Sequence, residues 1–109
     1  MTQDEVRQLA DDELCRLSRA AACYWATSPL EKIDLSVIAG KEWNPIKSTE
    51  QAMHLAALMD MNICFGDRVV LVSEPAGAQS RTVEYQFNRR LEAVRLAITL
   101  LAADSAQYI

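Results

Sequence analysis

Hydrophobic residues recur at helical spacing in three stretches of the chain. Intervals of four, three, four and three positions separate the apolar residues of an N-terminal stripe, Ala10, Leu14, Leu17, Ala21 and Tyr24. The same intervals separate those of a C-terminal stripe, Phe87, Leu91, Val94, Ile98 and Leu101. A shorter stripe lies between them at Ala52, Leu55, Ala56 and Met59. Such spacing places side chains on one face of a helix, so the pattern predicts an N-terminal, a middle and a C-terminal helix, the last over 87–103.

Polar residues mark where the first two helices begin. Thr2 and Glu5 have the spacing of a capping box, and a second helix start at Asp11 fits the pattern equally well. The N-terminal helix is therefore either continuous or begins again at Asp11. At the middle helix, we expect the Ser48 hydroxyl to accept a hydrogen bond from the Gln51 amide while the Gln51 side chain reaches back to Ser48.

Two β-rich runs joined by a short connection predict a hairpin. The runs 61–65 and 68–73 are separated by Gly66 and Asp67, and two-residue connections of this kind are typical of tight turns. The pattern therefore predicts two antiparallel strands with Gly66 and Asp67 at their turn.

The two faces of this hairpin are both apolar. If the connection forms the turn, Ile63 pairs with Val70, and the face that holds them is almost wholly hydrophobic. The other face carries Cys64, Val69 and Leu71, which is too apolar for a face that lies entirely in water. We therefore expect either a helix or another molecule to cover that side as well.

Two weaker patterns add strands to the sheet. Alternation of apolar and polar residues occurs over 33–37, after Pro29 has ended the N-terminal helix, and a last strand is predicted over 81–85. Helices before, between and after an antiparallel sheet of three or four strands give an α+β fold with helices on its two sides. With 109 residues and no internal repeat, residues 1–109 are expected to form a single domain.

Charge and composition exclude several classes of function. The net charge of −4 opposes binding to nucleic acid phosphates, so direct DNA binding is not expected. No apolar run approaches the roughly 20 residues of a membrane span, and the N-terminus is acidic, so neither membrane insertion nor secretion is indicated.

The residues that usually carry catalysis or bind metals are isolated from one another. Cys15, Cys23 and Cys64 each lie within an apolar pattern and are interpreted as reduced core residues of a cytosolic protein. His54 is the only histidine, and the three glycines stand singly rather than in a phosphate-binding loop. We therefore expect no enzyme activity, no cofactor and no metal site.

Tryptophan and arginine residues remain as candidates for binding. Trp43 precedes Asn44 and Pro45, and its ring either packs onto the domain, which the composition favours, or anchors a partner. Arginines crowd the last third of the chain, either as a solvated helix face or as a patch for an acidic partner or a phosphate. The candidate binding residues are Trp43, Arg81, Tyr85, Arg89 and Arg90.

Three segments of the chain carry a family resemblance. They are "DDELCRLSRAAACYW", "EWNPIKSTEQAMHLAALMDMNICFGDRVV" and "RRLEAVRLAITLLAAD". Their order resembles that of a family of small proteins of tailed bacteriophages and prophages, the phage ABA-sandwich domain. Trp43, Asn44 and Pro45 stand on the family's W-N-P motif, and Arg89 and Arg90 on its closing helix. The resemblance implies a three-layer α-β-α sandwich, which agrees with the two apolar faces of the hairpin.

The same resemblance implies a setting in the cytoplasm of a bacterial host. One class of function is a small non-enzymatic accessory protein that binds a host protein, for example as an inhibitor of a defence system such as CRISPR interference. The alternative is a small-molecule or nucleotide binder, in which arginine pairs with phosphate and Trp43 or Tyr85 stacks on a base. A homodimer through a sheet edge or the exposed sheet face is compatible with either class.

Overall fold

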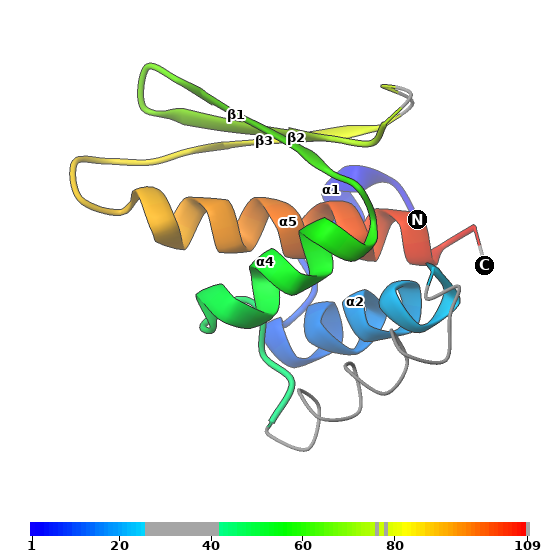
Figure 1. Cartoon of the computed structure of the whole chain (residues 1–109). Helices are drawn as coiled ribbons and strands as arrows, with labels where there is room; N and C mark the ends of the chain where they lie inside the picture. The colour runs from blue at the N-terminus through cyan, green and yellow to red at the C-terminus, as the bar shows by residue number, and fades with distance from the viewer. Residues whose placement is uncertain (26–41, 76, 78, 109) are drawn as a thin grey trace.

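A computed structural model of the protein describes residues 1–25, 42–75, 77 and 79–108. Its elements in chain order are α1 (Gln3–Arg7), α2 (Asp11–Trp25), α4 (Thr49–Leu58), β1 (Asn62–Gly66), β2 (Val69–Ser73), β3 (Ser80–Glu84) and α5 (Arg90–Ala106). The strands form one antiparallel sheet in the order β1-β2-β3 (Figure 1). The predicted α+β class is confirmed. The strand predicted over 33–37 and the helix end at Pro29 lie outside the described residues.

The N-terminal helix begins twice. Thr2 and Glu5 form the predicted capping box: the Glu5 amide donates to the Thr2 hydroxyl over 3.3 Å, and the Thr2 amide donates to the Glu5 carboxylate over 3.2 Å. This helix, α1, ends at Arg7, and α2 begins at Asp11 with three acidic residues in its first turn, where they complement the helix dipole. Of the two alternatives that the pattern left open, the second start is the one observed.

The hairpin forms with its turn one residue later than predicted. Gly66 pairs with Val69, so the two-residue connection is Asp67 and Arg68, and Arg68 takes a left-handed backbone with φ 57°. Ile63 therefore pairs with Val72 rather than with Val70. Because the register differs by two positions, every side chain keeps its predicted face.

The face of the sheet that holds Val70 and Val72 packs on α5, and the core lies between them. From residue 97 to residue 105 every position of α5 is buried, which is the pattern of a helix surrounded by protein on all sides. Its alanines let neighbouring backbones approach closely, and α5 contacts α1, α2, α4, β2 and β3. This helix is therefore the centre of the fold.

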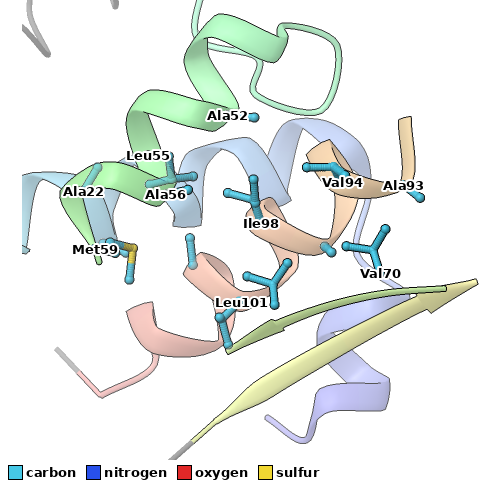
Figure 2. Close-up of a cluster of buried hydrophobic side chains, with 14 of the residues drawn as sticks. Ala22, Ala52, Leu55, Ala56, Met59, Val70, Ala93, Val94, Ile98 and Leu101 are labelled. Atoms are coloured by element: carbon cyan, nitrogen blue, oxygen red, sulfur yellow. The ribbon is translucent and has the colours of Figure 1, made fainter. Parts of the chain in front are cut away.

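Side chains from three elements meet in the core. Figure 2 shows Leu55 of α4, Ile98 of α5 and Val70 of β2 pointing into one cluster, and all three are fully buried. A second cluster brings Val6 of α1 and Leu14 of α2 against Leu100 and Ala103 of α5. All four residues of the predicted middle stripe are buried, as their spacing predicts, whereas Tyr24 of the N-terminal stripe is exposed.

The described helices all lie on one side of the sheet. Figure 1 shows the sheet at the top, α4 and α5 beneath it, and α2 beneath α5. Cys64 and Leu71, on the opposite sheet face, are exposed to solvent. In the described part of the chain the order of layers is therefore β-α-α, and the predicted covering of the second face, by a helix or by another molecule, stays a prediction. None of the described helices has the length and apolar composition that crossing a membrane requires.

Candidate functional site

The Trp43 side chain belongs to the fold. Its indole N–H donates to the Ser18 hydroxyl of α2 over 3.1 Å, and the half-buried ring packs against the main core cluster. Pro45 beside it is fully buried. A buried indole needs a hydrogen-bond partner, and Ser18 satisfies that need. Trp43 therefore connects the segment before α4 to α2 and does not stand out as an anchor for a partner.

Gln51 explains why the segment before α4 is rigid. Ser48 caps the helix as predicted, because the Gln51 amide donates to the Ser48 hydroxyl over 3.2 Å. The Gln51 side chain, however, accepts from the Asn44 amide over 2.6 Å and donates to the Glu42 carbonyl over 2.9 Å, rather than reaching Ser48. The W-N-P segment is thus fixed by hydrogen bonds to the first turn of α4.

Arg81 is a core residue rather than a surface one. Its guanidinium is 9% exposed and binds both carboxylate oxygens of Asp104 on α5, with N···O distances of 2.6 and 2.8 Å. The same guanidinium donates to the Gln3 carbonyl of α1 over 2.8 Å. Because these contacts occupy it, Arg81 is not available to bind a ligand.

Arg90 and Tyr85 lie together at the start of α5. The Arg90 Nε donates to the Tyr85 hydroxyl over 3.0 Å, and its guanidinium carbon lies 5.8 Å from the ring centroids of both Tyr85 and Phe65. Tyr85 is buried, whereas 56% of Phe65 is exposed. Cation–π contacts hold the arginine in this position while its outer surface still faces solvent.

Two residues of the predicted C-terminal stripe are not in the core. Phe87 is 88% exposed and Leu91 is 59% exposed, and Phe87 precedes α5, which begins only at Arg90. Phe87 sits in the connecting loop with a left-handed backbone, φ 40°, which is rare for a bulky residue. We call the surface formed by Phe87, Arg89, Arg90 and Leu91 the α5 corner.

A groove of about 820 Å³ lies beside the α5 corner, between β3, the hairpin turn and the start of α5. Its charged lining residues are Arg7, Arg68, Arg89, Asp67, Glu84 and Glu92. Val83, Ala93 and Leu96 give it an apolar floor. Arg89 lies 3.8 Å from Glu92, and both side chains are largely exposed. Since acidic residues balance the arginines, this groove does not have the charge of a phosphate site.

The structure therefore divides the predicted site residues. Arg89 and Tyr85 line the groove, and Arg90 covers Tyr85, whereas Trp43 and Arg81 lie in other parts of the molecule. The chain sequence did not point to Arg7 or Arg68, which the fold alone brings to the groove. Asn88, a residue type common at helix starts, is the one signal that could have placed Phe87 outside the helix.

The interpretation of the cysteines as core residues is right for one of the three. Cys15 is buried, its thiol lies 3.5 Å from the Asn44 side-chain oxygen, and burial raises the pKa of that thiol. Cys23 and Cys64 are exposed free thiols, because they lie on the solvent side of α2 and on the open sheet face. Among the described residues, no three His, Cys, Asp or Glu side chains are grouped as a metal site.

Comparison of the chain with protein-family models, with curated proteins and with solved structures gave no match. The resemblance to the phage ABA-sandwich domain therefore stays a prediction.

Proposed function

We propose that this chain is a non-enzymatic binding protein that acts by binding another protein through the α5 corner. The observation that carries the proposal is the pairing of exposed apolar side chains with arginines at one place. Phe87 and Leu91 are exposed beside Arg89 and Arg90, and aromatic residues and arginine are the types enriched at the energetic centres of protein interfaces.

The backbone at Phe87 supports the same proposal. A left-handed conformation costs a bulky residue on the order of 1 kcal/mol, and an exposed ring recovers none of this by packing in the isolated chain. A partner that buries the ring would supply the missing stabilisation. Strain at an exposed aromatic is therefore more readily explained by binding than by folding.

The partner is proposed to be a protein of a bacterial host, and the setting the host cytoplasm. This part of the proposal depends on the resemblance of the chain to small phage and prophage proteins. Stoichiometric inhibition of a host component, such as one that acts in defence, fits a small chain that offers an exposed binding surface.

The nucleotide-binding alternative is supported less well. It requires arginines and aromatic rings that converge on a pocket, but Arg81 and Trp43 are engaged in the fold. The groove that does hold Arg89 and Tyr85 balances its arginines with acidic side chains. Retention of a heat-stable nucleotide by the purified chain, lost on Arg89→Ala, would favour this alternative.

Capture of the partner followed by a binding measurement tests the proposal. The tagged chain is exposed to extract of a bacterial host, the retained protein is identified, and its affinity is measured by calorimetry with purified components. Phe87→Asn is the main variant, because Asn tolerates the left-handed backbone and the fold should be unaffected. We expect Phe87→Asn and Leu91→Asn each to weaken binding by about 30-fold, the effect of a typical hot-spot residue.

Tyr108→Asn is the matched control. Tyr108 is 78% exposed and follows the C-terminal end of α5 at Ala106. Its replacement should change affinity by less than about twofold, since it lies outside the proposed interface. The proposal is wrong if Phe87→Asn and Tyr108→Asn bind the captured protein equally well, or if the wild-type chain captures none.

A further inference from the structure

The two edge strands of the sheet differ in what covers them. Two backbone hydrogen bonds just beyond the ends of the β2–β3 ladder show which residue pairs of the ladder are hydrogen-bonded. The Tyr85 N–H donates to the Arg68 C=O over 2.9 Å, and the Glu74 N–H donates to the Gln79 C=O over 3.0 Å. Because hydrogen-bonded pairs alternate in an antiparallel ladder, the even-numbered residues of β2 bond to β3 and the odd-numbered ones to β1. The backbone N–H and C=O groups that point away from the sheet at its two edges are therefore those of residues 63 and 65 on β1, and of residues 80, 82 and 84 on β3.

The edge at β3 is guarded. The Ser80 carbonyl accepts a hydrogen bond from the Gln3 side chain of α1 over 3.0 Å, which confirms that this group faces outward. Glu84 also places an exposed charge in β3. Covering an edge with a helix and placing charges on it are two means by which proteins prevent strands of other chains from pairing there.

The edge at β1 lacks these features. Its sequence, NICFG, contains no charged residue and no proline. In the described part of the chain, the outward N–H and C=O groups of Ile63 and Phe65 have no hydrogen-bond partner outside the sheet ladder. More than half of the Phe65 ring is exposed. This edge is therefore open to an additional strand.

We propose that β1 pairs with β1 of a second copy of this chain, antiparallel and about a two-fold axis at Cys64, so that two sheets join into one. This inference goes beyond the proposed function and does not depend on it. Cys64 is the middle residue of β1 (Asn62–Gly66), so this axis lets the whole strand pair with its copy. Ile63 then lies opposite Phe65 of the second copy, and all outward N–H and C=O groups at these positions are satisfied.

The side chains around this axis complement their copies. On the inner face, Ile63 of one copy covers the exposed Phe65 ring of the other. The strand carries no charged residue, so the two copies do not repel along the interface.

A disulfide between the two Cys64 residues would show that the two β1 strands pair in the proposed register. Cys64 would face Cys64 of the second copy at a non-hydrogen-bonded position, where Cα atoms of paired strands lie about 4.5 Å apart. A disulfide spans Cα separations of roughly 4.4–6.8 Å, so mild oxidation should link the two copies at this residue. Cys23 is also exposed and serves as a control thiol in the same chain, while Cys15 is buried.

Sedimentation and cross-linking of the purified full chain test the proposal. Under reducing conditions we expect a dimer of about twice the 12.2 kDa monomer mass. After copper–phenanthroline oxidation, we expect a disulfide-linked dimer from the wild-type chain and from Cys23→Ser, and none from Cys64→Ser. Phe65→Pro removes an outward N–H without removing a ladder bond, so the dimer dissociation constant should rise at least about tenfold while the far-ultraviolet circular dichroism stays unchanged.

A monomeric wild-type chain, a dimer that cross-links only through Cys23, or a dimer that Phe65→Pro leaves intact would each overturn the proposal. Capture of a host protein that requires this edge, by a chain that is itself monomeric, would also overturn it. None of these results affects the test at Phe87.

Discussion

Arg81 and Asp104 form the one ion pair of the described residues that lies inside the fold. Both side chains are at least nine-tenths buried, and both guanidinium–carboxylate contacts are short. The pair joins the sheet to α5, and the Gln3 carbonyl adds α1 to the same network. The two side chains satisfy each other's hydrogen bonds and charge where water has no access. The loss of either one therefore leaves a buried charge without a partner.

Asp104→Asn is expected to lower the free energy of unfolding by about 3–5 kcal/mol, the usual cost of breaking a buried pair from one side. The double replacement Arg81→Met/Asp104→Leu should recover most of that loss, since it removes both charges and fills the space with apolar groups. Urea unfolding of the three proteins gives the comparison. A loss below about 1 kcal/mol for Asp104→Asn would contradict the assignment of the pair to the core.

Residue patterns alone could not identify this pair. Arg81 and the other arginines of the last third fit a surface patch, because arginine is seldom buried. Asp104 comes after the apolar residues of the C-terminal stripe and has the pattern of a polar position at its end. Only the packing of α5 against β3 shows that the two side chains meet, since they stand far apart in sequence.

At the scale of elements, the β1–β2 hairpin leaves no room for a side chain at position 66 beside its turn. A Cβ atom added at Gly66 would lie 2.7 Å from a methyl group of Val69, its cross-strand partner. Arg68 beside it adopts the left-handed backbone that the turn requires. Glycine at position 66 therefore serves close packing across the strands, and the positive φ falls on another residue.

Gly66→Ala should lower the free energy of unfolding by about 1–3 kcal/mol, the cost of inserting an atom into a packed contact. Adding Val69→Ala removes the methyl group that is too close, so the double variant should lose less than the sum of the two single variants. Thermal unfolding of the four proteins of this cycle measures the coupling. Additive losses would show that the Gly66–Val69 contact does not limit the hairpin.

The ends of helices were predictable from the sequence where a capping residue marks them. The capping box at Thr2 and the Ser48 cap determine two helix starts, and both were predicted from spacing. The hairpin turn was misplaced because glycine is the usual residue for a positive φ, whereas here Arg68 has it. The start of α5 was placed three residues early because Phe87 continues the apolar spacing, although its ring lies in solvent.

At the scale of the whole molecule, α5 connects all other parts. Both core clusters contain residues of α5, and it contacts α1, α2, α4 and two strands. Of the described helices, α5 makes the main packing contacts with β2 and β3. The remaining elements therefore have little to pack against when this helix is removed.

A fragment of residues 1–86 is expected to be unfolded, because the core positions of α5 are lost together. A second fragment that ends at residue 106 should remain folded, since it keeps the whole of α5 and loses only the C-terminal residues after that helix. Circular dichroism and amide hydrogen exchange distinguish the two outcomes. Protected amides in the β1–β2 hairpin of fragment 1–86 would contradict the central role of α5.

The candidate site belongs to this scale as well, which limits what could be foreseen from sequence. Tyr85, Arg89 and Arg90 are neighbours in sequence and were predicted together. Arg7 and Arg68 reach the same groove only because α1 and the hairpin turn both pack near the start of α5. Residues distant in sequence meet in this groove because of tertiary packing, which the spacing of residues along the chain does not predict.

The position of α5 late in the chain also affects how the protein is made. A ribosome completes α1, α2, α4 and the sheet before the helix on which all of them pack, so the apolar face with Val70 and Val72 is uncovered during synthesis. Nascent chains with such faces are prone to aggregate or to be held by chaperones. Folding of this domain is therefore expected to begin only after α5 has been synthesised.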